Sequence, residues 1–257
     1  MQHAGALARL QPFVERAREF SGWDLGFIGV RLLEPGPAWD YEALAAERAR
    51  HAHHGVDFGT GGGEVLAQVL ARVLAGVPQR PGSVIATEQR KVNAPVARDR
   101  LHDLGVPVLR CDSERPPLRE ASFDLVLSRH EAIDPAEIDR VLVPGGTFLT
   151  QQVTPDVWPE LRTFFPRATV FPDHYHAYAG WFEAHGYAVA LQRHDYRVAW
   201  ASLGELVVQL LVAPWTIPDF EVERDIEALL VLEAALTTPE GIVMTEGRYL
   251  LEAKKPG

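Results

Sequence analysis

Apolar and polar positions follow two different periods along the chain, and these periods predict its elements. From residue 55 onward, short apolar runs predict strands, and segments with apolar residues three and four positions apart predict helices. The expected strands cover 56–58, 83–87, 106–111, 123–127, 147–153, 187–200 and 247–255. The expected helices cover 6–20, 39–52, 65–74, 95–104, 135–143, 177–184, 203–212 and 221–236.

This order of elements predicts an α/β fold. Strands that alternate with helices across short loops run parallel and form a doubly wound sheet, with helices on both faces. Seven strands are expected, and two inserted helices separate the last two. We therefore expect four parts: an N-terminal helical cap (1–54), a core (55–200), a helical lid insertion (201–240) and the final core strand (241–257).

One helix start is marked by its capping residues. Asp134 is suited to the N-cap, Pro135 to the first helical position, and Glu137 to a capping box. The same pattern places the end of this helix at the Pro-Gly-Gly sequence of residues 144–146.

A glycine-rich turn follows the first core strand, in the sequence VDFGTGGGE. Glycine tolerates the backbone angles that such a turn needs, and the next helix begins with free N–H groups. A carboxylate, Asp57, stands at the strand end, where it disfavours a pyrophosphate and favours a ligand with a cationic end. The turn therefore predicts a ligand-binding loop, and the alternative is a tight strand–helix connection without a ligand.

Two further strands also end in polar residues. Glu88 follows the second core strand, and Asp112 with Ser113 follows the third. A carboxylate at the position of Glu88 can accept both hydroxyls of a ribose, and ligands of open parallel sheets bind outside the carboxyl ends of the strands. We therefore expect Asp57, Glu88 and Asp112 to line one crevice.

These motifs resemble the class I S-adenosylmethionine-dependent methyltransferases. The likeness covers about 56–153 and rests on VDFGTGGGEVL, IATE, CDSERPPLREASFDLVLSRHEA and RVLVPGGTFL. It implies a Rossmann-like fold with S-adenosylmethionine as cofactor. It further implies that the loop of Asp57, Gly59, Thr60, Gly61 and Gly63 holds the methionine part, that Glu88 binds the ribose, that Asp112 and Ser113 meet the adenine, and that Ser128 lies near the sulfonium. GTGGGE, SRHE, FLTQQV and PWTIPDF are similar to a narrower group of bacterial methyltransferase-like proteins of undefined substrate.

The residues after the fourth core strand are the expected catalytic groups. An imidazole titrates near neutral pH, so His130 is a candidate general base, and Glu131 is a candidate to orient it or to bind a substrate cation. The alternative is a surface ion pair between Arg129 and Glu131, with His130 capping a loop. The sequence here is not the Asn/Asp-Pro-Pro-aromatic motif of enzymes that methylate the exocyclic amines of bases or the side chain of glutamine.

Aromatic and histidine side chains outside these motifs are candidates for acceptor binding. His174, Tyr175 and His176 form one cluster, whose alternative is ordinary packing at a helix start. The His-x-His spacing lacks a third ligand, so no metal is expected. Trp23 and Trp215 are expected to close the pocket from the cap and the lid, and the alternative is that both are buried anchors.

Composition narrows the function further. The chain has 257 residues, 25 basic and 35 acidic side chains, a net charge of −10 and one cysteine. These numbers disfavour a nucleic-acid partner and exclude an intramolecular disulfide. Because no long apolar run or signal-peptide pattern is present, we expect a cytoplasmic protein without membrane contact. The expected function is methyl transfer to an O or N atom of a small-molecule acceptor. The alternatives are RNA-base methylation, a non-catalytic cofactor-binding protein and, more distantly, a nicotinamide-dependent oxidoreductase.

Overall fold

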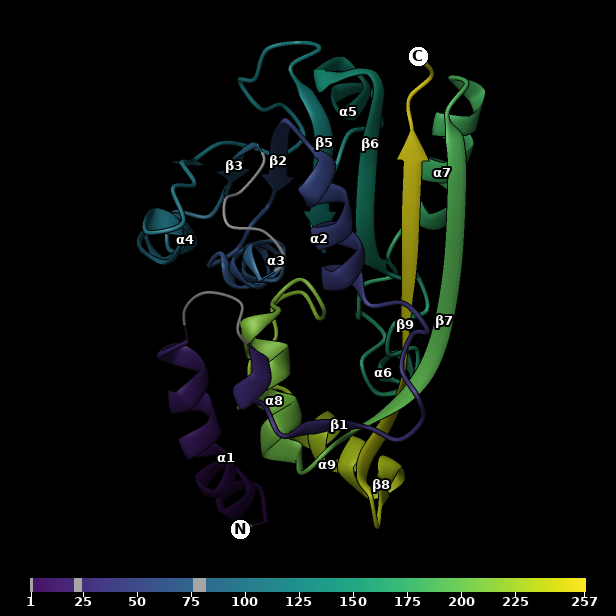
Figure 1. Cartoon of the computed structure of the whole chain (residues 1–257). Helices are drawn as coiled ribbons and strands as arrows, with labels where there is room; N and C mark the ends of the chain where they lie inside the picture. The colour runs from purple at the N-terminus through teal and green to yellow at the C-terminus, as the bar shows by residue number, and fades with distance from the viewer. Residues whose placement is uncertain (1, 21–24, 76–81) are drawn as a thin grey trace.

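The protein is an α/β structure built on one large sheet (Figure 1). The computed structural model describes residues 2–20, 25–75 and 82–257. The strands are β1 (Val30–Leu32), β2 (His54–Phe58), β3 (Ser83–Thr87), β4 (Val108–Leu109), β5 (Phe123–Arg129), β6 (Leu142–Val153), β7 (Ala188–Trp200), β8 (Thr237–Thr238) and β9 (Gly241–Lys254). The helices are α1 (Gln2–Arg18), α2 (Tyr41–His51), α3 (Glu64–Leu74), α4 (Asn93–His102), α5 (Pro135–Val141), α6 (Leu161–Phe164), α7 (His174–Ala184), α8 (Leu203–Val212) and α9 (Ile226–Leu236), with a short 3₁₀ turn at Leu25–Phe27.

The sheet has the strand order β1-β7-β9-β6-β5-β2-β3-β4, with β8 paired to β9. Strands β4, β3, β2, β5 and β6 are parallel, whereas β9 is antiparallel to both β6 and β7. The expected doubly wound α/β sheet is confirmed, and its last two long strands close it in antiparallel pairing. The expected number of strands is wrong: the described residues form nine, because the short strands β1 and β8 pair with the long ends of β7 and β9.

Alternating residues of the central strands pack against helices on opposite faces of the sheet, as the strand period of two requires. Leu125 and Leu127 of β5 contact the face covered by α2 and α3. Val126, between them, contacts the other face, where α5 and α7 pack with Phe148 of β6. Both faces of the central strands are therefore buried, which explains their continuous apolar sequences.

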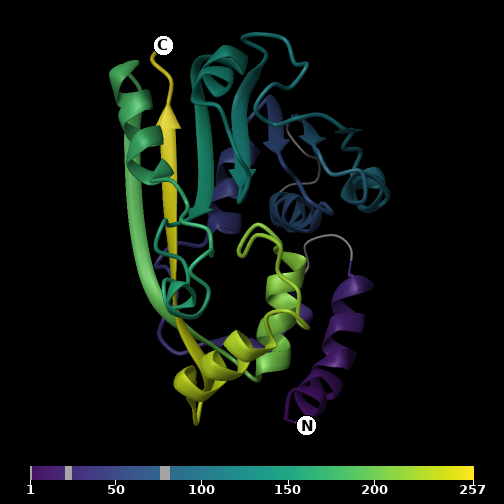
Figure 2. The ribbon, with the colours of Figure 1, turned by 180° about the vertical axis from the view of Figure 1, so that it is seen from behind.

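A second apolar cluster surrounds the helices inserted between β7 and β9. Helices α8 and α9 pack with α1 and with the long ends of these two strands (Figure 2). A side chain at Gly204 of α8 would overlap the ring of Phe13, so α1 and α8 approach closely at this glycine. In Figure 1, the arrows of β2 and β5 point toward the end of the molecule that holds α1, α8 and α9. The inserted helices thus lie on the side of the carboxyl ends of the parallel strands.

The expected cap of α5 forms only in part. The Asp134 side chain accepts a hydrogen bond from the N–H of Ala136, and Pro135 opens the helix. The Glu137 carboxylate instead binds the Arg140 guanidinium, so the expected capping box is absent. The helix also ends at Val141, and residues 144–146 belong to β6.

None of the helices within the three described ranges combines the length and the apolar character that crossing a bilayer requires. The four-part division at 54/55, 200/201 and 240/241 stays a prediction.

Candidate functional site

The glycine-rich turn lies between the end of β2 and the start of α3, with three glycines in the left-handed region. Gly59, Gly61 and Gly63 have φ angles of 68°, 64° and 81°, which side chains with a Cβ rarely adopt. The turn is also tied to β3, because the Thr60 N–H donates to the Thr87 carbonyl at 2.8 Å. The loop geometry therefore explains why the sequence needs glycine at these positions.

Glu88 holds the glycine turn from the end of β3. Its two carboxylate oxygens accept the N–H groups of Gly61 at 2.8 Å and Arg90 at 2.7 Å. The residue is only 3% exposed, and burial raises its pKa. Each carboxylate oxygen can accept a second hydrogen bond, so Glu88 keeps capacity for a ligand hydroxyl.

Two more acids lie around the turn. Burial raises the pKa of Asp57 to about 7, and the neighbouring Glu88 carboxylate adds to this effect. Burial likewise raises the pKa of Glu131 to about 7, again with Glu88 adding to it. A Cβ at Gly59 would overlap the Glu131 carboxylate, so Glu131 lies directly on the turn. Glu131 therefore does not form the surface pair with Arg129 that was the alternative to a functional role, and the three carboxylates form a cluster that favours a cation.

Buried polar groups without partners lie at the same strand ends. The Ser128 hydroxyl at the end of β5 is fully buried and has no hydrogen-bond partner among the residues that the structure describes. The same is true of the Ser113 hydroxyl beyond β4 and of the Asn93 side-chain NH₂ at the start of α4. A buried polar group without a partner is costly, so these groups point to a ligand or water. Asp112, next to Ser113, is exposed and accepts the N–H of Glu114.

His130 follows β5 in a conformation that is uncommon for a residue with a side chain. Its φ is 59°, and its N–H donates to the Gln151 carbonyl. His130 is an exposed residue, but other residues surround its imidazole closely enough to desolvate it. This enclosure, together with the Arg248 and Arg129 guanidiniums, keeps the pKa of His130 well below its usual value. His130 is therefore neutral at pH 7, with a ring nitrogen available to accept a proton.

A cavity of about 370 Å³ opens on the α2 face of the sheet, beside the end of β5. Its lining includes Trp39 and Tyr41 at the start of α2, Arg129, Gln151, Tyr196 and Arg248. The Tyr41 hydroxyl donates to the Ser128 carbonyl at 3.2 Å, which joins the cavity wall to the candidate cofactor crevice. The sequence did not indicate this cavity, because its walls come from α2, β5, β6, β7 and β9.

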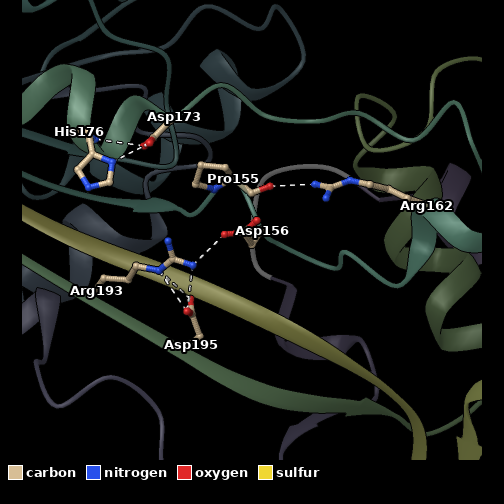
Figure 3. A network of polar contacts seen from close by, with 7 residues as sticks. All are labelled: Pro155, Asp156, Arg162, Asp173, His176, Arg193 and Asp195. Carbon is tan, nitrogen blue, oxygen red and sulfur yellow. Dashed lines mark hydrogen bonds and ion pairs between the residues drawn. The ribbon is translucent and has the colours of Figure 1, made fainter.

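The structure does not bring His174, Tyr175 and His176 to this cavity. The Tyr175 ring packs on Tyr249 at 5.4 Å, in the cluster on the opposite face of the sheet. His176 is exposed and binds the Asp173 carboxylate at 2.7 Å at the start of α7, near an ion-pair group that joins Arg193 to Asp156 and Asp195 (Figure 3). These contacts match the alternative of a capped helix start with ordinary aromatic packing.

Trp215 lies in the connection between α8 and α9. The residue is 46% exposed, so it is not a buried anchor, and the Arg90 guanidinium lies over its ring at 5.9 Å. Trp215 thus lies near the chain segment that follows β3, and it is not among the residues that line the cavity near Arg129. Trp23 lies outside the described residues. The described part of the chain contains no cluster of three side chains suited to a metal ion.

Comparisons with known proteins agree with this geometry. Residues 56–150 match the sequence profile of the family described as "Methyltransferase domain". The ubiquinone/menaquinone biosynthesis C-methyltransferase UbiE of Paraburkholderia xenovorans is 31% identical over 137 residues, which are 50% of this chain and 54% of that protein. The chain thus matches about half the length of this curated relative.

Solved structures share the fold over more of the chain. A putative methyltransferase from Bacillus halodurans has a TM-score of 0.60 and 17% identity, covering 84% of this chain and 99% of that one. The YcgJ protein of Bacillus subtilis has a TM-score of 0.59 and 18% identity, covering 84% and 98%. Residues 56–150 are therefore similar in sequence to the methyltransferase-domain family, and most of the chain shares the α/β fold of these two structures.

Proposed function

We propose that this protein transfers a methyl group from S-adenosylmethionine to an O or N atom of a small acceptor. The observation that carries the proposal is the cluster of Asp57, Glu88 and Glu131 around the glycine turn. The carboxyl groups of Asp57 and Glu131, whose pKa values are raised to about 7, ionise readily when a cation approaches them. S-adenosylmethionine presents an ammonium and a sulfonium group, together with ribose hydroxyls.

The other polar groups at the strand ends fit the same ligand. Glu88 retains lone pairs for the ribose hydroxyls, and the unpartnered Ser113 hydroxyl lies at the edge proposed for the adenine. The unpartnered Ser128 hydroxyl lies at the end of β5, where the sulfonium is proposed to lie. We propose that Gly59, Thr60, Gly61 and Gly63 provide the backbone surface for the methionine part, with Asp112 beside the adenine.

When bound, S-adenosylmethionine supplies an electrophilic methyl group on a positively charged sulfur. The protein has to align the acceptor atom and, where necessary, to remove its proton. We propose that His130 accepts this proton on its neutral ring nitrogen, because its lowered pKa keeps it unprotonated at pH 7. Glu131 is proposed to act on the cofactor side, where its carboxylate lies on Gly59.

A carbon acceptor is the second candidate. The UbiE relative is named as a C-methyltransferase, and its likeness covers the domain proposed to hold the cofactor. Removal of a phenol proton by His130 would also serve methylation of carbon, because a ring carbon of the resulting phenolate attacks the methyl group more readily.

Incubation with ¹³C-methyl-labelled S-adenosylmethionine and cell extract, separated into small molecules and RNA, tests the proposal. We expect the label in the small-molecule fraction, and the ¹³C shift of the product distinguishes O-, N- and C-methyl groups. The Glu88→Ala variant is the control for label transferred by other enzymes. Label confined to RNA, or equal labelling by the variant and the wild type, would contradict the proposal.

A further inference from the structure

We propose that the cavity beside the end of β5 binds the methyl acceptor through an anionic group, and that the acceptor is a small aromatic acid. This inference rests on the proposed function in one respect, which is that the bound ligand is the methyl acceptor. The binding site itself is argued from the cavity.

The first argument is the charge of Arg129. Arg129 lines the cavity, and its Nε–H is buried without a hydrogen-bond partner in the described part of the chain. Within the described ranges, no carboxylate forms an ion pair with Arg129. An arginine fork that is partly buried and unpaired is costly to maintain, and carboxylate is the ligand that matches it in shape and charge.

The second argument is that another guanidinium lies beside the first. Arg248 lines the same cavity, and burial, with Arg129 adding to the effect, lowers its pKa to about 10. Of the acids around the cavity, Glu246 binds Arg248, whereas Asp40 and Glu42 both bind Arg72. Asp57 lies near Arg129 on the cofactor side but forms no ion pair with it in the described structure. Glu246 thus neutralises Arg248, and the lining acids Asp40 and Glu42 share the Arg72 guanidinium, so Arg129 is the arginine of this lining that has no carboxylate partner among the described residues.

The third argument is the shape and composition of the walls. Trp39 is fixed by its indole N–H, which donates to the Gln151 side chain at 2.7 Å, and Tyr41 is fixed by its bond to the Ser128 carbonyl. Tyr196 provides another aromatic wall. A cavity of about 370 Å³ lies at the small end of the range for ligand pockets, so it suits one substituted ring.

The position of the cavity connects this anion site to the proposed chemistry. His130 directly follows Arg129, and both arginines contribute to its low pKa. A bound carboxylate neutralises these charges and brings the pKa of His130 closer to its usual value, which makes the imidazole a better proton acceptor. The anion site thus orients the acceptor and favours the proposed role of His130.

Binding of three probes to the ligand-free protein tests the inference: benzoate, phenyl phosphate and the neutral benzamide, followed by ligand-observed NMR. We expect benzoate to bind about tenfold or more tightly than benzamide, and Arg129→Gln and Arg248→Gln each to remove about tenfold or more of that affinity. Arg129→Lys should retain part of it, because it keeps the charge and loses the fork. Arg193→Gln, in the ion-pair group on β7, is the matched control and should bind benzoate like the wild type. Tighter binding of phenyl phosphate would identify the acceptor's anion as a phosphate.

The folding of the variants is checked by thermal unfolding. Loss of the unpaired Arg129 should leave the melting temperature unchanged or raise it, because it removes a repulsion with Arg248. Equal affinity for benzoate and benzamide, no binding of any probe, or benzoate affinity unchanged in both glutamine variants would overturn the inference. Titration with S-adenosylmethionine on the same samples reports on the proposed function separately, because the probes are measured without cofactor.

Discussion

Replacing Glu88 by alanine should weaken binding of S-adenosylmethionine by roughly 1–3 kcal/mol, which is about a 5- to 150-fold increase in Kd. The variant loses the proposed hydrogen bonds to the ribose and the carboxylate that fixes the Gly61 and Arg90 N–H groups. Isothermal titration calorimetry on the purified variant and the wild type measures this difference directly.

Two further variants separate ligand contact from loop support. Glu88→Gln keeps an acceptor oxygen but loses the charge, so it should bind with intermediate affinity. Glu183→Ala removes one exposed carboxylate from α7 and should bind like the wild type. Unchanged affinity in Glu88→Ala would refute the assignment of the ribose site.

Binding of S-adenosylmethionine should strengthen by about tenfold or more between pH 5.5 and 7.5. The pKa of Asp57 is raised to about 7 in the free protein, so most of this carboxyl group is protonated at pH 5.5. A cationic ligand needs the ionised form, and binding at low pH must therefore release the proton. Over this range the ligand's own ammonium stays mostly protonated. Calorimetric titrations with S-adenosylmethionine at several pH values measure how the affinity changes with pH. The same series on a Glu131→Gln variant isolates the contribution of Asp57.

The raised pKa of Asp57 also affects how the stability of the ligand-free protein depends on pH. The folded-state pKa of Asp57 is raised above its unfolded value, so the folded protein binds more protons between about pH 4 and pH 7. The contribution of Asp57 to stability therefore falls as the pH rises through this range and is constant above it. In the Asp57→Asn variant, the melting temperature should therefore fall less steeply with rising pH between about pH 4 and pH 7. A pH profile of binding that is equally steep in Asp57→Asn would show that another group titrates.

The sequence predicted the central part of the fold because its signals are local. Periodic apolar residues placed β3 at 83–87 and α8 at 203–212, where the structure has them. β1 and β8 escaped prediction because each has only two or three residues. Both exist only through pairing with β7 and β9, which long-range contact provides.

The crevice at the carboxyl ends was predictable for a related reason. Asp57 lies at the end of one recognisable strand and Glu88 directly follows the next, and parallel strands bring their carboxyl ends to one edge. Asp112, expected in the same crevice, is instead exposed. The role of Glu131 against Gly59 was not predictable from spacing, because it depends on the path of the chain after the left-handed His130.

The arginine cavity shows where a sequence pattern carries no signal. Arg248 lies in the middle of β9 and Trp39 before α2, more than 200 residues apart, and neither belongs to a motif. Only the pairing of β9 between β6 and β7 brings Arg248 to the end of β5. Residues 174–176 show the reverse situation. They are adjacent in sequence and looked like a binding cluster, but they cap and pack a helix on the other face of the sheet.

The most direct test of the proposed cofactor is calorimetric titration of the wild-type protein with S-adenosylmethionine and, separately, with NADH. A crevice lined by Asp57, Glu88 and Glu131 should bind the cationic sulfonium compound at a single site and reject the pyrophosphate of NADH. Saturable binding of S-adenosylmethionine alone is the predicted result. Binding of NADH, or no binding of S-adenosylmethionine at millimolar concentration, would contradict the proposed function.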